Sequence, residues 1–233
     1  MNIVITGCSR GIGYELTHEL LQNPHNKVLG ISRNVLALEE IKKSAVHNNF
    51  DYLGFDLEEI IDKSDIFKND ILTRINRVDI LINNAGQLEN KPFNNFKYEN
   101  VSKIFKINLF AVGEIIRILV PLMGQDKPSH VVNIGSMGGV QGSKKFSGIA
   151  WYSASKAALA CLTECLAEEY KLQNIYFNCL ALGAVQTEML SKAFPDYQAP
   201  HNALEMAKYI AEFAVNGHKY FNGKILPVSI STP

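Results

Sequence analysis

Short apolar runs alternate with helix-length amphipathic segments along this chain of 233 residues. The pattern predicts seven strands, at residues 2–6, 27–32, 50–55, 79–83, 130–135, 175–180 and 224–228. Between them it predicts six helices, at residues 12–22, 36–46, 60–75, 101–122, 152–172 and 203–215. Alternation of this kind produces parallel strands joined by right-handed crossovers. We therefore expect an α/β fold with helices on both faces of one parallel sheet.

The longest stretches without a regular pattern are residues 87–100, 138–150 and 187–202. Each follows the carboxyl end of a predicted strand, where open parallel sheets bind their ligands. No repeat, low-complexity tract or long linker divides the chain. We expect a single domain over residues 1–233, with a short substrate-loop segment at about 187–202.

Composition excludes several classes of protein. Lys plus Arg and Asp plus Glu both total 23, so the formal net charge is zero, which argues against nucleic-acid and anionic-membrane partners. The sequence opens MNIVITG without a secretory signal pattern, and the apolar stretch at 104–123 is too interrupted by polar residues to span a membrane. Four cysteines make no disulfide framework, and Cys161 and Cys165 lack the further ligands of a metal site. We expect both to be small core residues, no metal, and a cytoplasmic location.

Two of the predicted helices, at 101–122 and 152–172, carry apolar residues around much of their circumference. A helix lying on a sheet needs only one apolar stripe, so the extra faces need another cover. A second subunit is the favoured cover, with the chain's own loops as the alternative. We expect a homodimer or homotetramer.

A glycine-rich turn joins the first strand to the first helix. Gly7, Gly11 and Gly13 let the backbone approach a pyrophosphate closely, and the helix start offers unpaired N–H groups to the phosphates. The position of the turn favours dinucleotide binding over a plain turn. The fourth strand ends in the small residues Asn84, Ala85 and Gly86, which suit close packing against a ligand, although this sequence alone also fits a turn.

Tyr152 and Lys156 are four residues apart on a predicted helix and therefore share a face. A free phenol has a pKa of about 10 and is a poor acid–base catalyst near neutrality, but an ammonium nearby lowers that pKa. Ser136, at the end of the fifth strand, can reach a carbonyl oxygen beside the tyrosine. Asn108 is a polar residue inside an apolar helix segment and needs buried partners.

Together these motifs resemble those of the short-chain dehydrogenase/reductase family, in order and approximate spacing, from residue 2 to about residue 190. The resemblance implies a doubly wound Rossmann-type sheet of about seven strands in the order 3-2-1-4-5-6-7, in a three-layer α/β/α sandwich. It implies hydride transfer between a nicotinamide cofactor and a carbonyl or secondary alcohol of a small molecule, with the catalytic residues Asn108, Ser136, Tyr152 and Lys156. It implies a cofactor site made of Gly7, Ser9, Arg10, Gly11, Ile12, Gly13, Ser32, Arg33, Asn34, Asp56, Leu57, Asn84, Ala85, Gly86, Tyr152, Lys156, Gly183, Val185 and Thr187.

In this family pattern Tyr152 exchanges the proton with the substrate oxygen, and Lys156 holds the nicotinamide ribose and lowers the tyrosine pKa. Ser136 polarises the substrate oxygen, and Asn108 holds the water chain that resupplies the proton. Three departures concern the substrate region and the oligomer. The segment between Ser136 and Tyr152 is a few residues longer than is usual, Leu182 stands where the family usually has proline, and the last strand lacks a terminal Gly-Gly pair.

The second predicted strand ends in Ser32, Arg33 and Asn34, with no carboxylate at the position where NAD-preferring folds place one. Arg33 can bind a ribose phosphate in bidentate fashion, and Arg10 can approach it from the other side. NADP is therefore the expected cofactor, with NAD less favoured. Two other functions stay open: a non-catalytic dinucleotide-binding regulator or scaffold, and an epimerase or dehydratase of the same family, against which the short 187–202 segment argues.

Overall fold

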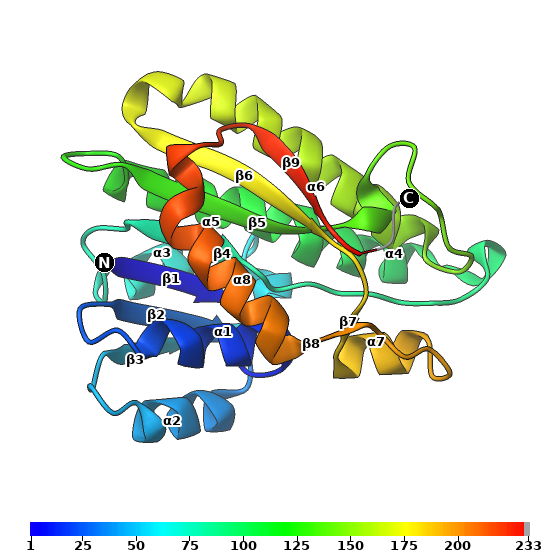
Figure 1. Ribbon diagram of the computed structural model, residues 1–233, viewed down its shortest axis with the longest axis horizontal. Coiled ribbons are helices and arrows are strands. Elements are labelled where there is room, and N and C mark those ends of the chain that lie inside the picture. Colours follow the sequence, from blue (N-terminus) through cyan, green and yellow to red (C-terminus); the bar gives the residue numbers. More distant parts are fainter. Residues whose placement is uncertain (231–233) are drawn as a thin grey trace.

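The computed structural model describes residues 1–230 and is built around a parallel sheet (Figure 1). Its seven strands run in the order β3-β2-β1-β4-β5-β6-β9, which confirms the predicted topology. Their bounds are β1 Asn2–Thr6, β2 Lys27–Ser32, β3 Phe50–Gly54, β4 Ile80–Asn83, β5 Ser129–Ser136, β6 Ile175–Leu182 and β9 Lys224–Val228. Ile82 of β4 lies between Ile5 of β1 and Val132 of β5, so the central strands are in register and buried on both faces.

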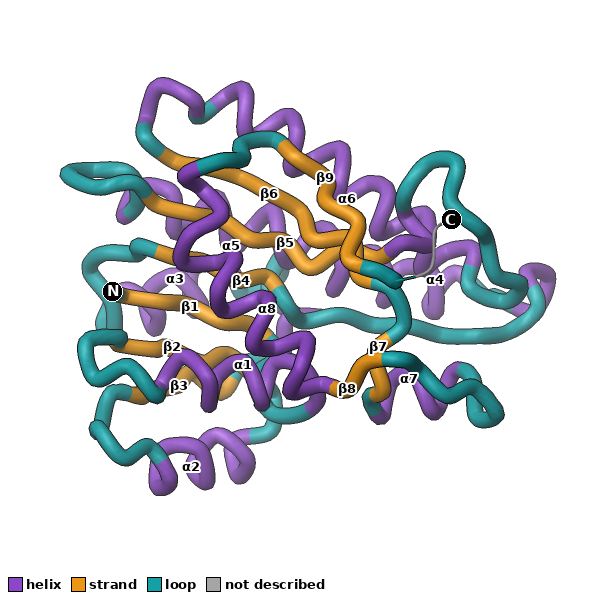
Figure 2. Tube along the Cα trace, viewed as in Figure 1, coloured by secondary structure: helices purple, strands orange, loops and turns teal. Residues whose placement is uncertain are grey.

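Helices cover both faces, as Figure 2 shows. On the face toward the viewer lie α1 Gly11–Leu21, α2 Val35–Ser44 and α8 Ala203–Asn216, and behind the sheet lie α3 Ser64–Leu72, α4 Tyr98–Phe105, α5 Ala111–Leu119 and α6 Ala150–Glu169. Each face has its own apolar core, because successive residues of a buried strand point to opposite sides. Ile3 and Ile5 pack with Leu16 and Ile210 on one side, while Val4 packs with the helices of the other.

Short 3₁₀ turns connect or extend these elements, at Leu57–Glu59, Phe93–Asn95, Val120–Leu122, Met137–Gly139, Lys171–Gln173 and Gly217–Lys219. The prediction of a single helix over residues 101–122 is wrong in detail. The helix begins at Tyr98, passes through a π-helical turn at Lys106–Phe110 and ends at Leu119. The π turn contains Asn108, whose side chain is bonded to the backbone of another loop, and such insertions often mark functional positions.

The segment predicted as an irregular substrate loop at 187–202 has structure of its own. Helix α7 occupies Glu188–Ala193, and the two-residue strands β7 Val185–Gln186 and β8 His201–Asn202 pair in parallel at the two ends of the segment. Thr187 caps α7 by accepting a hydrogen bond from the Leu190 amide. The segment is therefore anchored at both ends beside the carboxyl edge of the sheet (Figure 1).

The prediction that Cys161 and Cys165 are core residues is wrong. Both are exposed, whereas Cys8 and Cys179 are buried. Helix α6 packs against the sheet through the side that carries Leu159, and the two cysteines, one turn apart, lie together on another side. Apolar residues around a helix do not show which side faces the sheet.

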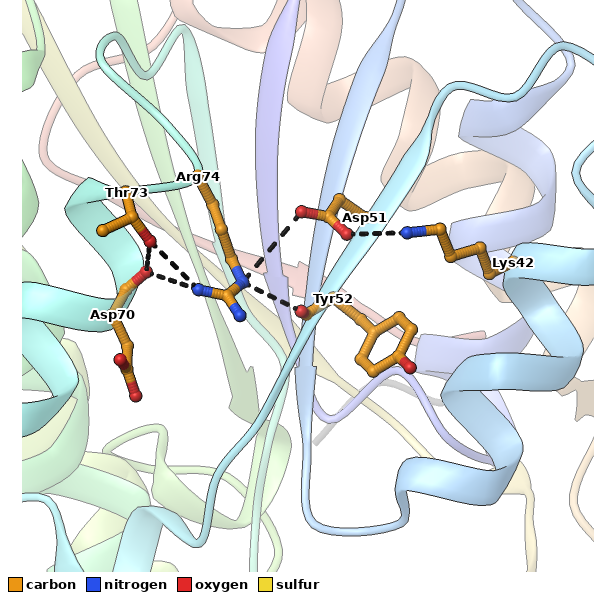
Figure 3. Close-up of polar contacts among 6 residues, drawn as sticks. All are labelled: Lys42, Asp51, Tyr52, Asp70, Thr73 and Arg74. Atoms are coloured by element: carbon orange, nitrogen blue, oxygen red, sulfur yellow. Dashed lines mark hydrogen bonds and ion pairs between the residues drawn. The ribbon is translucent and has the colours of Figure 1, made fainter.

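The edge strand β3 is protected by charged side chains (Figure 3). Arg74 donates to the Tyr52 carbonyl at 3.2 Å and to the Asp70 carbonyl at 2.8 Å, so it satisfies a backbone group that has no strand beside it. On the other side, Lys42 forms an ion pair with Asp51 at 3.1 Å. Cations at an exposed edge oppose pairing with another chain.

Within residues 1–230, no helix is long and apolar enough to cross a membrane.

A neutral histidine lies at the amino end of β5, far along the strand from Ser136. His130 donates from Nδ1 to the Ala214 carbonyl at 2.9 Å, because a carbonyl can only accept, and its Nε2 accepts from the Asn178 amide at 3.0 Å. Burial, opposed by the hydrogen bond to Ala214 and assisted by the neighbouring His218, lowers the pKa of His130 from 6.5 to about 4. A proton on Nε2 would face a donor instead of an acceptor.

We expect acid to destabilise the protein through His130. The unfolded state binds a proton below pH 6.5 and the folded state only below about 4, so the stability is present above pH 6.5 and is lost as the pH falls through that window. The loss is on the order of 3 kcal/mol. Urea unfolding at a series of pH values measures it: His130→Gln flattens the dependence, while the exposed His47→Gln leaves it unchanged. An equal slope for wild type and His130→Gln would contradict this expectation.

Candidate functional site

A cavity of about 790 Å³ opens at the carboxyl edge of the sheet. Its wall runs from the glycine-rich turn after β1, past the ends of β2, β4, β5 and β6, to helix α7. This is the edge at which parallel α/β sheets bind ligands. All the predicted site residues line the cavity except Asn108, which lies behind its wall.

The glycine turn forms a backbone cradle at the start of α1. Gly7 has φ +72° and Gly11 has φ +55°, values that side chains rarely adopt. A Cβ atom on Gly13 would lie 2.1 Å from the Gly7 carbonyl oxygen, so the turn also leaves no room for one there. No side chain caps the helix start and its first turn has no acidic residue, which leaves the positive end of the helix free for an anion.

Asn84 fixes this cradle to strand β4. Its amide nitrogen donates to the carbonyls of Thr6 and Gly7 at 3.0 and 3.1 Å, and the Thr6 hydroxyl accepts from the backbone amides of Asn84 and Ala85. Asn84 therefore ties the glycine turn to the end of β4. Asn83 instead points into the core, where it donates to Asn133 at 2.8 Å.

The two arginines expected near a ribose phosphate both line the cavity, and each already has a carboxylate partner. Arg33 lies 3.6 Å from Asp56, and Arg10 lies 3.0 Å from Glu188 at the start of α7. All four side chains are at least one third exposed. Sequence reasoning missed Glu188, although its spacing to Lys192, with which it also pairs, is that of a helical ion pair.

Lys156 is buried on α6, directly below Tyr152. Its ammonium donates to the Ile134 carbonyl of β5 at 2.7 Å and lies 5.9 Å from the Tyr152 ring centre. Burial lowers the pKa of Lys156 from 10.5 to about 8. The hydrogen bond fixes the ammonium at the strand end, where it faces the cavity.

Tyr152 and Ser136 meet inside the cavity. Burial raises the pKa of the Tyr152 phenol, and a hydrogen bond with the Ser136 hydroxyl opposes that rise. Ser136 also accepts from the Gly138 amide at 3.2 Å, which orients its hydroxyl at the end of β5. A protonated phenol beside a second hydroxyl is an arrangement that can hold a carbonyl oxygen and exchange a proton with it.

Asn108 supports the site from behind. Its amide donates to the Gln87 carbonyl and to the Ser155 hydroxyl, both at 2.9 Å, and its oxygen accepts from the Gln87 backbone amide at 2.7 Å. Ser155 in turn donates to the Tyr152 carbonyl at 2.7 Å. These contacts supply the buried partners that the sequence demanded for Asn108, and they connect it to the helix that carries Tyr152.

The loop after β6 completes the cavity. The Gly183 amide donates to the Val228 carbonyl of β9 at 2.9 Å, and Val185 begins the short strand β7. The Thr187 methyl group lies 3.6 Å from where a Cβ of Gly11 would stand, so this loop closes against the glycine turn.

The end of the cavity near α7 is lined mainly by apolar side chains. Phe146, Met189, Phe194, Tyr197 and Lys144 line it. The rings of Phe93 and Trp151 stack on each other with ring centres 5.5 Å apart, and neither residue lines the cavity. Sequence reasoning missed Leu88, Met137, Ile149, Leu190 and Pro200, because apolar residues in loops and in a short helix carry no clear periodic signal.

Comparison with known proteins identifies the same family on most of the chain. The family model described as "short chain dehydrogenase" matches residues 1–198. An uncharacterized oxidoreductase of Staphylococcus saprophyticus is 33% identical over 80% of this chain and 75% of its own length. The 3-oxoacyl-[acyl-carrier-protein] reductase of Vibrio cholerae is 28% identical over 97% of this chain and 94% of its own length.

Solved structures have the same fold. The 3-ketoacyl-(acyl-carrier-protein) reductase of Brucella melitensis, complexed with NADH, has a TM-score of 0.85 at 21% identity, covering 97% of this chain and 96% of its own. The L-sorbose reductase of Gluconobacter frateurii, complexed with NADPH and L-sorbose, has a TM-score of 0.86 at 22% identity, covering 99% and 95%. With the family model matched over residues 1–198 and its motifs gathered around one cavity, this chain belongs to the short-chain dehydrogenase family of oxidoreductases.

Proposed function

We propose that this protein is an NADP(H)-dependent oxidoreductase that transfers a hydride between nicotinamide and a carbonyl or secondary alcohol of a small molecule. The observation that carries the proposal is that Tyr152, hydrogen-bonded to Ser136, faces the same cavity as the glycine cradle. The cradle suits a dinucleotide, because backbone fills the space where a Cβ of Gly7 or Gly13 would stand and because the start of α1 is uncapped. Gly7, Ser9, Gly11 and Ile12 would hold the pyrophosphate.

The nicotinamide group, when bound, supplies or accepts the hydride. Tyr152 donates a proton to the carbonyl oxygen during reduction and removes it from the alcohol during oxidation. Ser136 donates a hydrogen bond to the same oxygen and so polarises it. The Lys156 ammonium holds the ribose and stabilises the phenolate, which offsets the effect of burial on the tyrosine pKa. Asn108, through Gln87 and Ser155, keeps the wall behind the cofactor in place.

A non-catalytic dinucleotide-binding regulator or scaffold is the second candidate. Such a protein needs the cradle but has no use for a phenol, a hydroxyl and an ammonium gathered beside it. The presence of all three groups in the cavity favours the enzyme.

Replacing Tyr152 by Phe removes only the proton donor. We expect Tyr152→Phe to lower kcat/KM for carbonyl reduction by at least about a hundredfold while the Kd for NADPH stays nearly constant. Tyr220→Phe, the same chemical change at an exposed residue outside the cavity, should retain activity. A screen of carbonyl compounds by NADPH absorbance supplies the substrate, and fluorescence titration supplies the Kd. Full activity in Tyr152→Phe would refute the mechanism, and NADPH binding without turnover of any compound would favour the regulator.

The preference for NADP rests on Arg33 and Arg10. Their partners Asp56 and Glu188 are exposed enough that each ion pair contributes only about 0–1 kcal/mol, whereas a ribose phosphate carries more charge and accepts a bidentate guanidinium. Ser32, bonded to Ser9 at 2.8 Å, offers a hydroxyl at the same end of the cavity. Bound phosphate would therefore displace the carboxylates.

We expect NADPH to be preferred over NADH, and Arg33→Ala to raise the KM for NADPH about tenfold while the KM for NADH changes little. Lys43→Ala removes the same charge from exposed α2 outside this cavity and should change neither value. Steady-state kinetics with both cofactors measures the effect. Equal kcat/KM for the two cofactors in the wild type would overturn the NADP assignment.

The proposal includes a homo-oligomer formed through α4, α5 and α6. Phe110, at the end of the π turn, is 49% exposed, and the small residues Ala154, Ala157 and Cys161 are exposed on α6. Small side chains let a facing helix approach closely, and an exposed phenylalanine gains from burial against a partner.

We expect a dimer or tetramer by light scattering at micromolar concentration, and Phe110→Glu to shift the mass toward that of the 26.0 kDa monomer. A carboxylate buried between apolar helices would cost more than association returns. Leu36→Glu changes a residue that is 73% exposed on α2 and should leave the mass unchanged. A monomeric wild type would count decisively against the oligomer.

A further inference from the structure

The cavity extends beyond Tyr152 into a compartment with apolar walls. Two segments supply most of the wall: the segment before α6, longer than is usual in the family, and the region from α7 to Pro200. They contribute Phe146, Ile149, Met189, Phe194 and Tyr197, and Met137 lies at the end of β5. Ligand compartments of this kind take up apolar groups because burial removes their surface from water.

The walls are tied to each other. Phe146 and Phe194 make an edge-to-face contact with ring centres 6.3 Å apart. Asn90 donates to the Ala193 carbonyl at 2.6 Å, and the Lys91 amide donates to the Gly148 carbonyl at 3.0 Å, so a third loop joins the other two. Figure 1 shows α7 beyond the carboxyl ends of the strands, where this joined wall stands. The compartment therefore has a defined width. The polar groups of Asn90 and Lys91 named here bond to other parts of the wall.

The mouth of this compartment carries one cation, Lys144. Within residues 1–230 no ion pair forms at Lys144, whose ammonium lies 5.9 Å from the Phe146 ring centre. The adjacent Lys145 differs: its ammonium donates to the Val140 carbonyl and to the Ser143 hydroxyl, so it holds the loop together. The other charged residues of the cavity are Lys156 and the two ion pairs of the dinucleotide end.

We propose that the substrate is an amphipathic oxo-acid, whose apolar chain fills this compartment and whose carboxylate pairs with Lys144. The inference rests on the proposed function, since it takes the reacting carbonyl to lie at Tyr152. A cation at the edge of an apolar surface raises the local concentration of anions and is less screened than one in open water. Its contact with Phe146 places the charge beside the apolar wall that holds the chain.

A series of oxo-acids with increasing distance between ketone and carboxylate, each paired with its methyl ester, tests the proposal. The acid and the ester share the ketone and the apolar chain and differ in charge. With NADPH and the wild-type protein, we expect the acid of optimal length to have a kcat/KM about fivefold above that of its ester, because one ion pair near the surface contributes up to about that factor. Lys144→Ala should remove the difference by raising the KM for the acid alone, and Lys144→Glu should reverse it.

Lys91→Ala is the matched control. Lys91 lies in the loop that joins this wall, but its ammonium pairs with Glu89 at 2.8 Å and it does not line the cavity. Equal kcat/KM for every acid and its ester in the wild type, or the same loss in Lys91→Ala as in Lys144→Ala, would overturn the assignment. Phe146→Ala should raise the KM for acid and ester alike.

Calorimetric titration of the same compounds into the protein with NADP⁺ separates this inference from the proposed function. Acid binding that weakens in Lys144→Ala supports the carboxylate site even where no compound is reduced, and in that case the proposed oxidoreductase activity fails alone. Reduction of esters and acids at equal rates, with equal binding in Lys144→Ala, refutes the carboxylate site and leaves the oxidoreductase standing.

Discussion

The site depends on one buried charge. An ammonium taken out of water must be paired or hydrogen-bonded, and Lys156 meets that demand through the Ile134 carbonyl at the end of β5. That bond holds α6 against the sheet near the carboxyl end of β5. It thereby positions Tyr152 beside Ser136. Burial of the ammonium also lowers its pKa to about 8. The buried charge therefore reduces the free energy of unfolding.

Buried polar contacts extend this arrangement across the rear layer. Asn83 of β4 donates to Asn133 of β5, which donates to Thr163 of α6 at 2.9 Å. Asn108 makes a similar connection nearer the cavity, from Gln87 to Ser155. In a medium of low polarity such donors and acceptors must find each other, so the helix that carries Tyr152 has one position on the sheet. Apolar packing alone would leave the helix more freedom to slide.

Much of the fold could be predicted from the sequence, because buried parallel strands are short continuous apolar runs. The continuous apolar runs Ile80 to Ile82 and Val131 to Ile134 indicate strands that are buried on both faces. The strand order follows from the resemblance of the motifs to those of the family. The glycine turn and the pair Tyr152 and Lys156 were predictable for a related reason. Their chemistry needs particular residues at fixed local spacing, and local spacing can be read along a chain.

Features that depend on distant partners could not be read in this way. Arg10 and Glu188 lie 178 positions apart, so no local pattern links the glycine turn to α7. The partner of Asn108 in the π turn is the backbone of Gln87, and the exposure of Cys161 is set by the side of α6 that faces the sheet. Much of the apolar lining of the cavity comes from loops and the short helix α7, where hydrophobic residues follow no clear period.

The two-residue strands β7 and β8 close the base of the segment that carries α7. Val185 pairs with His201 and Gln186 with Asn202, so the intervening segment leaves the body and returns to it at nearly one point. A loop closed at its base can change in composition without shifting helix α6, which carries Tyr152, or strand β5, which ends in Ser136. Exchange of the cavity-facing side chains of this segment can therefore change the shape of the cavity, while the ion pair of Glu188 with Arg10 and the hydrogen bond from Asn90 to the Ala193 carbonyl still hold the segment in place.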